Sequence, residues 1–240
     1  MKNFLIYCPI RNKALEYAIA MLPVSPAPNE QVTHLLLPVP SFTPDGGIRG
    51  GGDLKNILSA LPENITVIGG NLQHPDLSGY KCLDLLEDAY YVTENADITA
   101  RCAVKLLSDC LPFTLKNCPI LLIGWGRIGK CLARLLRAND ALVTVCARKE
   151  ADRALLQVLG YSAQSAPDPT CYRVVINTAP APVLSTCPDT VFKMELSSVM
   201  GIAGSDVLWA KGLPAIHAPE SSGMLIADTI NRLLSKEEEA

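Results

Sequence analysis

Residues 121–136, LLIGWGRIGKCLARLL, carry a glycine-spaced turn that decides how the second half of the chain folds. The run PILLIG, residues 119–124, predicts a buried strand, and ALVTVC, residues 141–146, predicts another. Between them, apolar residues recur at i, i+4, i+7 and i+8, the spacing of one helix face: Ile128, Leu132, Leu135 and Leu136. The pattern therefore predicts a βαβ unit whose helix begins at the turn.

The same alternation continues along the chain. A helical pattern covers residues 150–159, and further strands are expected at 173–177, 191–196 and 213–217. Strands alternating with helices are typical of a parallel sheet with helices on both faces. We therefore expect an α/β fold in which a Rossmann doubly wound sheet occupies residues 99–220.

The first half is less regular. FLIYC (4–8), HLLLPV (34–39) and ITVIGG (65–70) predict strands, and residues 38–53, PVPSFTPDGGIRGGGD, predict a loop. Its glycines would let the backbone approach a ligand closely, although a flexible surface loop is the alternative. Helices are expected at 94–111, with Ala103, Leu106, Leu107 and Cys110 on one face, and near the C-terminus, with Ile226, Ile230, Leu233 and Leu234 on one face.

Composition narrows the class of protein. The 240 residues are 49% hydrophobic and 19% charged, with a net charge of -3 and no basic stripe, so a nucleic-acid partner is not expected. The N-terminal apolar run is too short for a signal peptide, and no apolar stretch approaches a membrane span, which predicts a cytoplasmic protein. Nine cysteines without a CxxC or CxxH pair predict buried reduced thiols, and with three scattered histidines they predict no metal site.

The turn GWGRIG has the features of a dinucleotide site. Gly124 would allow the tight turn out of the strand, and Gly126 would let a pyrophosphate approach the backbone. Gly129 would let the helix pack closely against the sheet. The free N–H groups around Arg127 and Ile128 would face the phosphates, with Trp125 inside the turn. A purely structural glycine turn is the alternative.

The end of the second strand indicates which dinucleotide. NAD sites carry Asp or Glu there, on the ribose 2′-hydroxyl, whereas an Arg accommodates the 2′-phosphate of NADP. This chain has Ala147, Arg148 and Lys149, which favours NADP because a guanidinium can bind a phosphate. The alternative is that both cations belong to a solvated helix entrance.

Two further strand ends complete the predicted cofactor site. INTAP places Asn177, Thr178, Ala179 and Pro180 where ligands bind in open α/β sheets, and Ser197 follows the next strand within ELSS. A plain turn is the alternative for INTAP.

Together these motifs resemble the A subunits of bacterial dipicolinate synthase, relatives of the NAD(P)-dependent 2-hydroxyacid dehydrogenases. The resemblance rests on IGWGRIG, the VxVxAR strand end, INTxP, ELSS in place of D-L-A-S, and LPAIHAPESSG in place of L-P-G-x-x-A-P-K-T-A-G. It implies an NADP-binding Rossmann domain and a smaller, flavodoxin-like N-terminal domain over residues 1–98. It also implies a last helix, residues 221–240, that returns to the first domain, and a homodimer.

The resemblance also implies a reaction, namely oxidation of a hydroxylated tetrahydropyridine dicarboxylate to dipicolinate during sporulation, in partnership with a flavoprotein-like B subunit. The chain departs from the family at residues 93–100, which lack the family's Pro, Glu and Gly at the corresponding positions, and at Glu220, where the family has Lys. About two dozen residues separate the first two predicted strands, so we expect a shortened N-terminal domain without one strand–helix step.

Residues for catalysis and substrate complete the sequence-based predictions. His217, with Glu220 nearby, is the candidate acid or base, and an ordinary histidine is the alternative. Substrate contacts are assigned to Ser41, Gly46, Gly47, Glu220, Ser221 and Ser222. Three functions stay open: a dipicolinate-synthase-like NADP oxidoreductase, another NADP dehydrogenase of a small hydroxy or imino acid, and a non-catalytic NADP-binding subunit.

Overall fold

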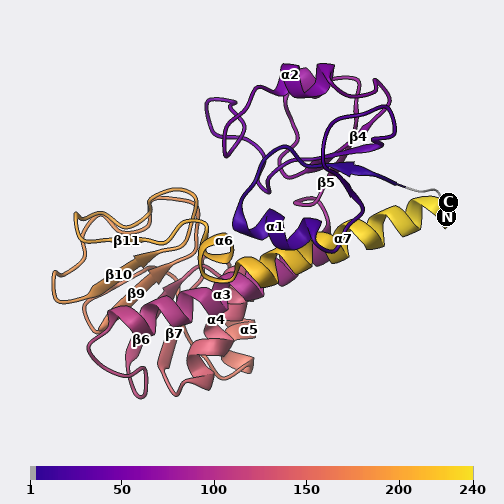
Figure 1. Cartoon of the computed structure of the whole chain (residues 1–240). Coiled ribbons are helices and arrows are strands. Elements are labelled where there is room, and N and C mark those ends of the chain that lie inside the picture. Colours follow the sequence, from indigo (N-terminus) through magenta and orange to yellow (C-terminus); the bar gives the residue numbers. More distant parts are fainter. Residues whose placement is uncertain (1–3, 240) are drawn as a thin grey trace. The chain divides into compact units, whose positions relative to one another are not determined.

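The computed structural model describes residues 4–239, so Ala240, the end of the last predicted helix, lies outside the described residues. The chain divides into two compact units. The first comprises Met1–Asn95 and Pro214–Ala240, and the second comprises Ala96–Leu213. Figure 1 gives the labels of the helices and strands.

The first unit is built on a five-stranded parallel sheet with the order β2-β1-β3-β4-β5. This is the flavodoxin-like strand order, as the resemblance implied. Its strands are β1 (Ile6–Tyr7), β2 (Val24–Ser25), β3 (His34–Leu36), β4 (Thr66–Gly69) and β5 (Lys81–Asp84). Its short helices are α1 (Lys13–Ile19), α2 (Leu54–Ser59) and the 3-10 turn η1 (Pro75–Leu77).

The strand–helix step expected to be missing is present, so that prediction was wrong. The segment between β1 and β3 holds helix α1 and strand β2. Asn12 caps α1, its side chain accepting a hydrogen bond from the Leu15 N–H at 2.9 Å. Because β2 has only two residues and α1 seven, both are too short for periodicity to reveal them.

Helix α7 (Pro219–Glu239) lies along α1 in the first unit (Figure 1). Gly223 makes this packing possible, because a Cβ there would lie 2.4 Å from the Ala14 carbonyl oxygen and 2.5 Å from the Tyr17 Cβ. Ile226, Ile230 and Leu234 are buried, as expected of the apolar face. The ESSG segment that resembles the family motif is therefore part of a helix-packing contact.

The second unit contains a six-stranded parallel sheet with the order β11-β10-β9-β6-β7-β8, the Rossmann order. Its strands are β6 (Pro119–Ile123), β7 (Leu142–Cys146), β8 (Ser162–Gln164), β9 (Val174–Asn177), β10 (Phe192–Glu195) and β11 (Leu208–Trp209). Helices α4 (Arg127–Ala138) and α5 (Glu150–Val158) connect β6 to β7 and β7 to β8. The long helix α3 (Ala89–Cys110) runs across the division between the units. The predicted α/β Rossmann fold class is confirmed.

Helices were expected on both faces along the whole Rossmann sheet, but the connections after β9 and β10 contain no helix, so that detail was wrong. Their residues Leu184, Val191 and Ile202 pack against Leu121 and Val175 on one face of the sheet. Irregular segments can cover a sheet because its apolar face must be shielded from water, and a helix is not needed for that.

Residues 213–217, expected as a strand, form helix α6 (Leu213–His217). A run of five residues is too short for periodicity to separate strand from helix, and Pro214 fits the first turn of a helix.

The cysteines are more exposed than expected. None of the nine forms a disulfide, but only Cys8, Cys102, Cys118 and Cys146 are buried, whereas Cys82, Cys110 and Cys171 are exposed. The prediction of buried thiols was therefore wrong for the last three, including Cys110 on the expected apolar face of α3. No helix in the described part of the chain is both long and apolar enough to cross a membrane.

Candidate functional site

The glycine turn links β6 to α4 with a geometry that only glycine allows. Gly124 has φ 103°, and a Cβ on it would lie 2.5 Å from the Thr178 Oγ1. A Cβ on Gly129 would lie 2.3 Å from the Gly124 carbonyl oxygen, so helix and turn touch through bare backbone. Gly126 differs, because a Cβ there would meet no atom within 4 Å.

Gly126 is also the N-cap of α4, and no side chain caps the helix. The first N–H groups of the helix, which begins at Arg127, therefore lack a capping side chain, and the positive end of the helix dipole lies behind them. Open space at Gly126 together with uncapped N–H groups forms a place where the backbone can bind an anion.

A pocket of about 570 Å³ opens at this turn. Its lining comes from the carboxyl ends of β6, β7 and β9 and from the segment after β8, all within the second unit. It brings together many of the predicted cofactor residues: Gly124, Trp125, Gly126, Ala147, Arg148, Lys149, Thr178, Ala179 and Pro180. Arg127, Ile128, Gly129, Asn177 and Ser197 are not among the lining residues, and Ile128 lies in the first turn of α4.

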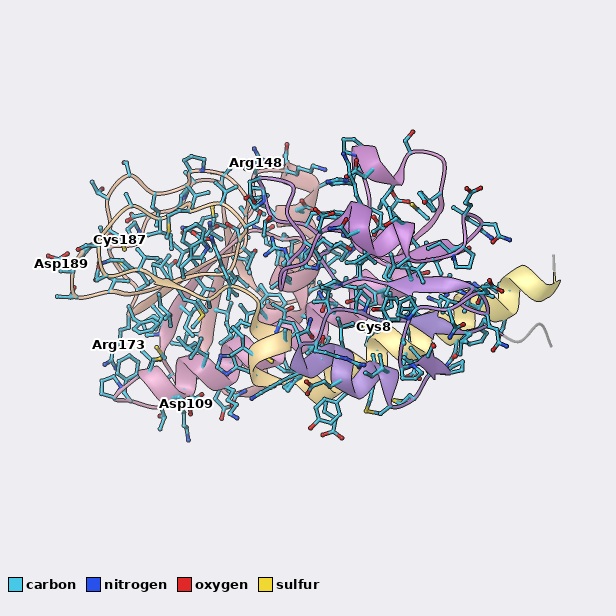
Figure 2. All side chains as sticks on the ribbon, turned by 45° about the horizontal axis from the view of Figure 1, so that its top comes forward. Cys8, Asp109, Arg148, Arg173, Cys187 and Asp189 are labelled. Atoms are coloured by element: carbon cyan, nitrogen blue, oxygen red, sulfur yellow. The ribbon has the colours of Figure 1, made fainter. Side chains whose placement is uncertain are left out.

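Two unpaired cations line this pocket. Arg148 and Lys149 are exposed, and neither side chain makes a hydrogen bond or ion pair with any described residue. Figure 2 labels Arg148 on the second unit. Arg153 holds the turn beneath them, because its Nη1 donates to the carbonyl oxygens of Ala147, at 2.9 Å, and Arg148, at 2.6 Å. The cations therefore extend from a braced backbone.

Sequence reasoning missed part of the lining. Asp152 in the first turn of α5 also faces the pocket, and its carboxylate has no partner among the residues the structure describes. Ser165, Ala166 and Pro167 complete the wall. They follow β8, a three-residue strand that was not predicted. Asp152 lies in the first turn of α5, beyond residues 147–149, on which the cofactor prediction rests.

The polar side chains of INTAP, Asn177 and Thr178, form hydrogen bonds within the protein. The Thr178 Oγ1 donates to the Ile123 carbonyl oxygen at 2.9 Å, which ties the ends of β6 and β9 together. Asn177 is fully buried; its Oδ1 accepts from the Ala179 N–H at 2.9 Å, and its Nδ2 donates to the Ala179 carbonyl oxygen at 2.9 Å. Both side chains fix the turn that lines the pocket.

Glu195 connects this turn to the next strand end. Its side chain is fully buried and accepts from the Asn177 Nδ2 at 2.9 and 3.0 Å, from the Ser197 N–H at 3.0 Å and from the Gly201 N–H at 2.8 Å. The Ser197 hydroxyl donates to the Val199 carbonyl oxygen. Sequence analysis noted ELSS for its serine, but the glutamate organises the site, since a charge at the end of a buried strand requires partners.

Trp125 has a donor without a partner. Its Nε1 is buried and makes no hydrogen bond, while its ring meets Tyr161 edge-on with centroids 6.0 Å apart. The Lys130 Nζ lies 5.9 Å from the Trp125 ring centroid. A tryptophan in the pocket wall is therefore a reporter of binding there.

The predicted substrate residues of the loop after β3 lie in the first unit. Ser41 is fully buried; its hydroxyl donates to the Pro38 carbonyl oxygen at 2.7 Å and accepts from the Gly70 N–H at 3.0 Å. Gly46 has φ 86°, and the Gly47 carbonyl oxygen accepts from both the N–H and the hydroxyl of Thr43 at 2.8 Å. Ser41 thus anchors the loop, and Gly46 and Gly47 form its tip.

The remaining predicted residues lie around the start of α7. His217 is exposed at the end of α6, and no hydrogen bond or ion pair joins it to Glu220 or to another described side chain. Glu220 and Ser221 are exposed in the first turn of α7, whereas Ser222 is buried and its N–H donates to the Ala218 carbonyl oxygen at 3.0 Å. The structure therefore does not pair His217 with a carboxylate.

One chain that combines a flavodoxin-like unit and a Rossmann unit with a glycine turn has the fold of two-domain nucleotide-dependent dehydrogenases. The apo-structure of D-lactate dehydrogenase from Escherichia coli shares this fold, with a TM-score of 0.60, 14% identity and coverage of 99% of this chain and 98% of that one.

More specific similarity is to the A subunits of dipicolinate synthase. The A subunit from Bacillus subtilis is 24% identical over 238 residues, covering 87% of this chain and 80% of the relative. The crystal structure of the same kind of chain from Bacillus subtilis has a TM-score of 0.82 at 20% identity, covering 100% of this chain and 99% of that one. The crystal structure of the A subunit from Bacillus halodurans has a TM-score of 0.81 at 21% identity, covering 97% of both chains. No family model matches. The resemblance predicted from the motifs is confirmed.

Proposed function

We propose that this chain is an NADP-dependent oxidoreductase subunit that oxidises a hydroxylated tetrahydropyridine dicarboxylate to dipicolinate. The observation that carries the proposal is the pocket of the second unit, in which an open glycine turn and two unpaired cations line one cavity. The substrate class comes from the name of the relatives, the A subunits of dipicolinate synthase.

The residues present fit a dinucleotide. Open space at Gly126 and the uncapped start of α4 suit a pyrophosphate, because backbone N–H groups and the helix dipole both favour an anion. Gly124, Ala147 and Pro180 give the pocket small or rigid walls. The pocket volume, about 570 Å³, lies in the range of small-molecule sites.

The charges favour NADP over NAD. Arg148 and Lys149 are free to bind a 2′-phosphate, and a guanidinium can do so with two parallel charge-assisted hydrogen bonds. Asp152 opposes them, since its carboxylate repels a phosphate but can accept a hydrogen bond from a ribose hydroxyl. Two cations against one anion leave a net attraction for the phosphate.

The chemistry divides between cofactor and chain. When bound, NADP⁺ supplies the hydride acceptor for a substrate that loses water, one hydride and one proton as its ring becomes aromatic. The chain binds and orients the cofactor. The hydrogen bonds of Glu195 with Asn177 and Gly201 fix the INTAP turn, and the N-terminus of α4 would bind the phosphates. We assign the proton transfer to no residue of this pocket.

A non-catalytic NADP-binding subunit is the second candidate. It is favoured by the exposure of His217 and by the lack of a bond to Glu220, since an acid or base is usually oriented by a second group. In that case a flavoprotein-like partner subunit would complete the enzyme. We propose a homodimer as the assembly of this chain.

Parallel titrations with NADPH and NADH test the cofactor assignment. Both tryptophans, Trp125 and Trp209, lie in the second unit, so their fluorescence reports on the proposed pocket. We expect NADPH to bind at least tenfold more tightly than NADH, about 1.4 kcal/mol. Arg148→Ala should erase that difference, whereas Arg134→Ala, an exposed arginine of α4 paired with Asp97, should keep it.

Gly126→Ala provides the sharper variant. Its φ of -79° suits alanine and the added Cβ meets no protein atom, so the variant should fold normally. The same Cβ would occupy the space for the phosphates, and we expect NADPH affinity to fall at least tenfold. Unchanged NADPH binding by Gly126→Ala and Arg148→Ala would disprove the cofactor site. Turnover of the hydroxylated tetrahydropyridine dicarboxylate, with and without a partner subunit, then separates an enzyme from a binding subunit.

A further inference from the structure

A histidine that the predicted chemistry does not use lies beside the glycine loop of the first unit. His74 follows β4, and the loop of residues 37–53 follows the adjacent parallel strand β3. Strand order reverses between β1 and β3, and ligands of such sheets bind at the carboxyl ends of the strands near that reversal. His74 and the loop therefore share the edge where a ligand of this unit is expected.

The His74 ring is held from two sides. It stacks on Phe42 of the loop, with centroids 4.5 Å apart and planes 25° apart. Its Nδ1 accepts a hydrogen bond from the Asp76 N–H at 3.2 Å and so caps the turn η1. Such a ring has lost most of its rotational freedom before any ligand binds.

The cap also decides which nitrogen carries the proton. Because Nδ1 accepts from a backbone N–H, the neutral ring must carry its proton on Nε2. The Nε2 lies 3.7 Å from where a Cβ on Gly46 would be, so the absent side chain of that glycine leaves the N–H uncovered. The His74 side chain keeps 17% of its surface exposed.

The charges around the ring favour an anion. The Arg49 Nε donates to the Phe42 carbonyl oxygen at 2.9 Å, which places an exposed guanidinium on the residue that stacks on His74. Asp76 is the acidic neighbour, with its Oδ2 at 3.9 Å from the His74 Nδ1, but Lys55 lies 3.7 Å from its other oxygen. The carboxylate is thus on the Nδ1 side, away from the free Nε2–H.

We propose that His74 is a substrate-positioning residue, whose Nε2–H donates a hydrogen bond to a carboxylate of the dicarboxylate substrate with Arg49 as the accompanying cation. This rests on the proposed function for the identity of the substrate. His74, rather than His217, is then the histidine of this chain that contacts the substrate. The Nε2–H is the donor in this arrangement, because Nδ1 is already the acceptor of the cap on η1.

Histidine-labelled protein allows a direct test by NMR, because the chain has only three histidines, His34, His74 and His217. Ring ¹⁵N shifts are recorded on the full chain with NADP⁺, before and after addition of dipicolinate. We expect His74 to be in the Nε2–H tautomer and to be the ring that shifts with dipicolinate. A proton on Nδ1, or shifts confined to the other two rings, would overturn the assignment.

Two variants separate the donor from the cap. In His74→Asn the side-chain oxygen can still accept from the Asp76 N–H, but the distal donor is lost, so stability should stay and dipicolinate affinity should fall at least tenfold. His74→Gln places an amide N–H near the Nε2 position and should retain much of the affinity while weakening the turn. Equal dipicolinate affinity in His74→Asn and the parent chain, or a larger loss in His217→Asn, would overturn the proposal.

The cofactor assignment is tested by a measurement that does not depend on His74. NADPH titration reports on the second unit, and His74→Asn should leave it unchanged. If NADPH binds and dipicolinate does not bind the parent chain, the role of His74 is wrong while the cofactor site stands. If neither binds, the proposed function fails first.

Discussion

Replacing Glu195 by glutamine should destabilise the second unit strongly although the side chain keeps its shape. The carboxylate accepts from three donors: the Asn177 Nδ2, the Ser197 N–H and the Gly201 N–H. Glutamine has one acceptor oxygen instead of two, so its amide nitrogen must face one of these N–H groups. Burial prevents water from replacing the lost partner, because the side chain is fully buried.

The magnitude follows from these bonds. A buried donor left without an acceptor costs about 1–3 kcal/mol, and bonds to a charged acceptor are stronger by about 1 kcal/mol each than bonds to a neutral one. We therefore expect Glu195→Gln to lower the free energy of unfolding by about 3–5 kcal/mol. That is a large share of the roughly 5–15 kcal/mol that holds a typical domain folded.

Urea unfolding followed by tryptophan fluorescence measures this change. Both tryptophans lie in the second unit, so the signal follows that unit even if the first unfolds separately. Glu150→Gln, an exposed glutamate of α5 in the same unit, is the matched control and should change the midpoint little. A Glu195→Gln midpoint within error of the parent would refute the reasoning, because it would mean that the network contributes no net stability.

Three further predictions follow from other contacts. Gly129→Ala puts a Cβ 2.3 Å from a backbone oxygen and should abolish NADPH binding and lower the melting temperature, in contrast to a well-folded Gly126→Ala. Asp152→Asn should increase the preference for NADPH over NADH, measured as the ratio of dissociation constants, because it removes the one opposing charge of the described pocket lining. Burial raises the pKa of Asp88, but the Tyr91 N–H and Arg232 lower it further, so it lies below its usual range. Asp88→Asn should therefore destabilise at neutral pH, and urea titrations should show the difference vanishing as the pH falls through that lowered pKa.

The Rossmann part of the fold could be predicted because its strands β6, β7 and β9 are mostly apolar and four or five residues long. The flavodoxin-like part depended on the family resemblance. Strands β2 and β11 have two residues each and β8 has three, too few for a period to appear. Their position is set by pairing with neighbours along the sheet, which is a tertiary interaction.

The candidate site was predictable in position but not in the roles of its residues. Glycines at fixed spacing and free cations after a strand are local features, so the pocket at Gly126 and Arg148 follows from the sequence. The partners of Asn177 and Ser41 are distant in sequence, at Glu195 and Gly70, and only the fold brings them together. Sequence alone could not show that these side chains are already occupied.

At the edges of the two sheets, some polar groups form hydrogen bonds to the backbone, and others have no partner among the described residues. The side chains of Asn177, Thr178 and Ser41 make hydrogen bonds to backbone groups of turns and strand ends. These bonds fix the shape of each sheet edge. What remains for a ligand is uncapped backbone at α4, the charges of Arg148 and Lys149, and the His74 Nε2–H. Since a group already paired inside the protein must lose that bond to bind a ligand, the unpaired groups gain more from binding. We therefore expect substitutions at the free groups to change affinity with little change in stability, and substitutions at the paired groups to change both.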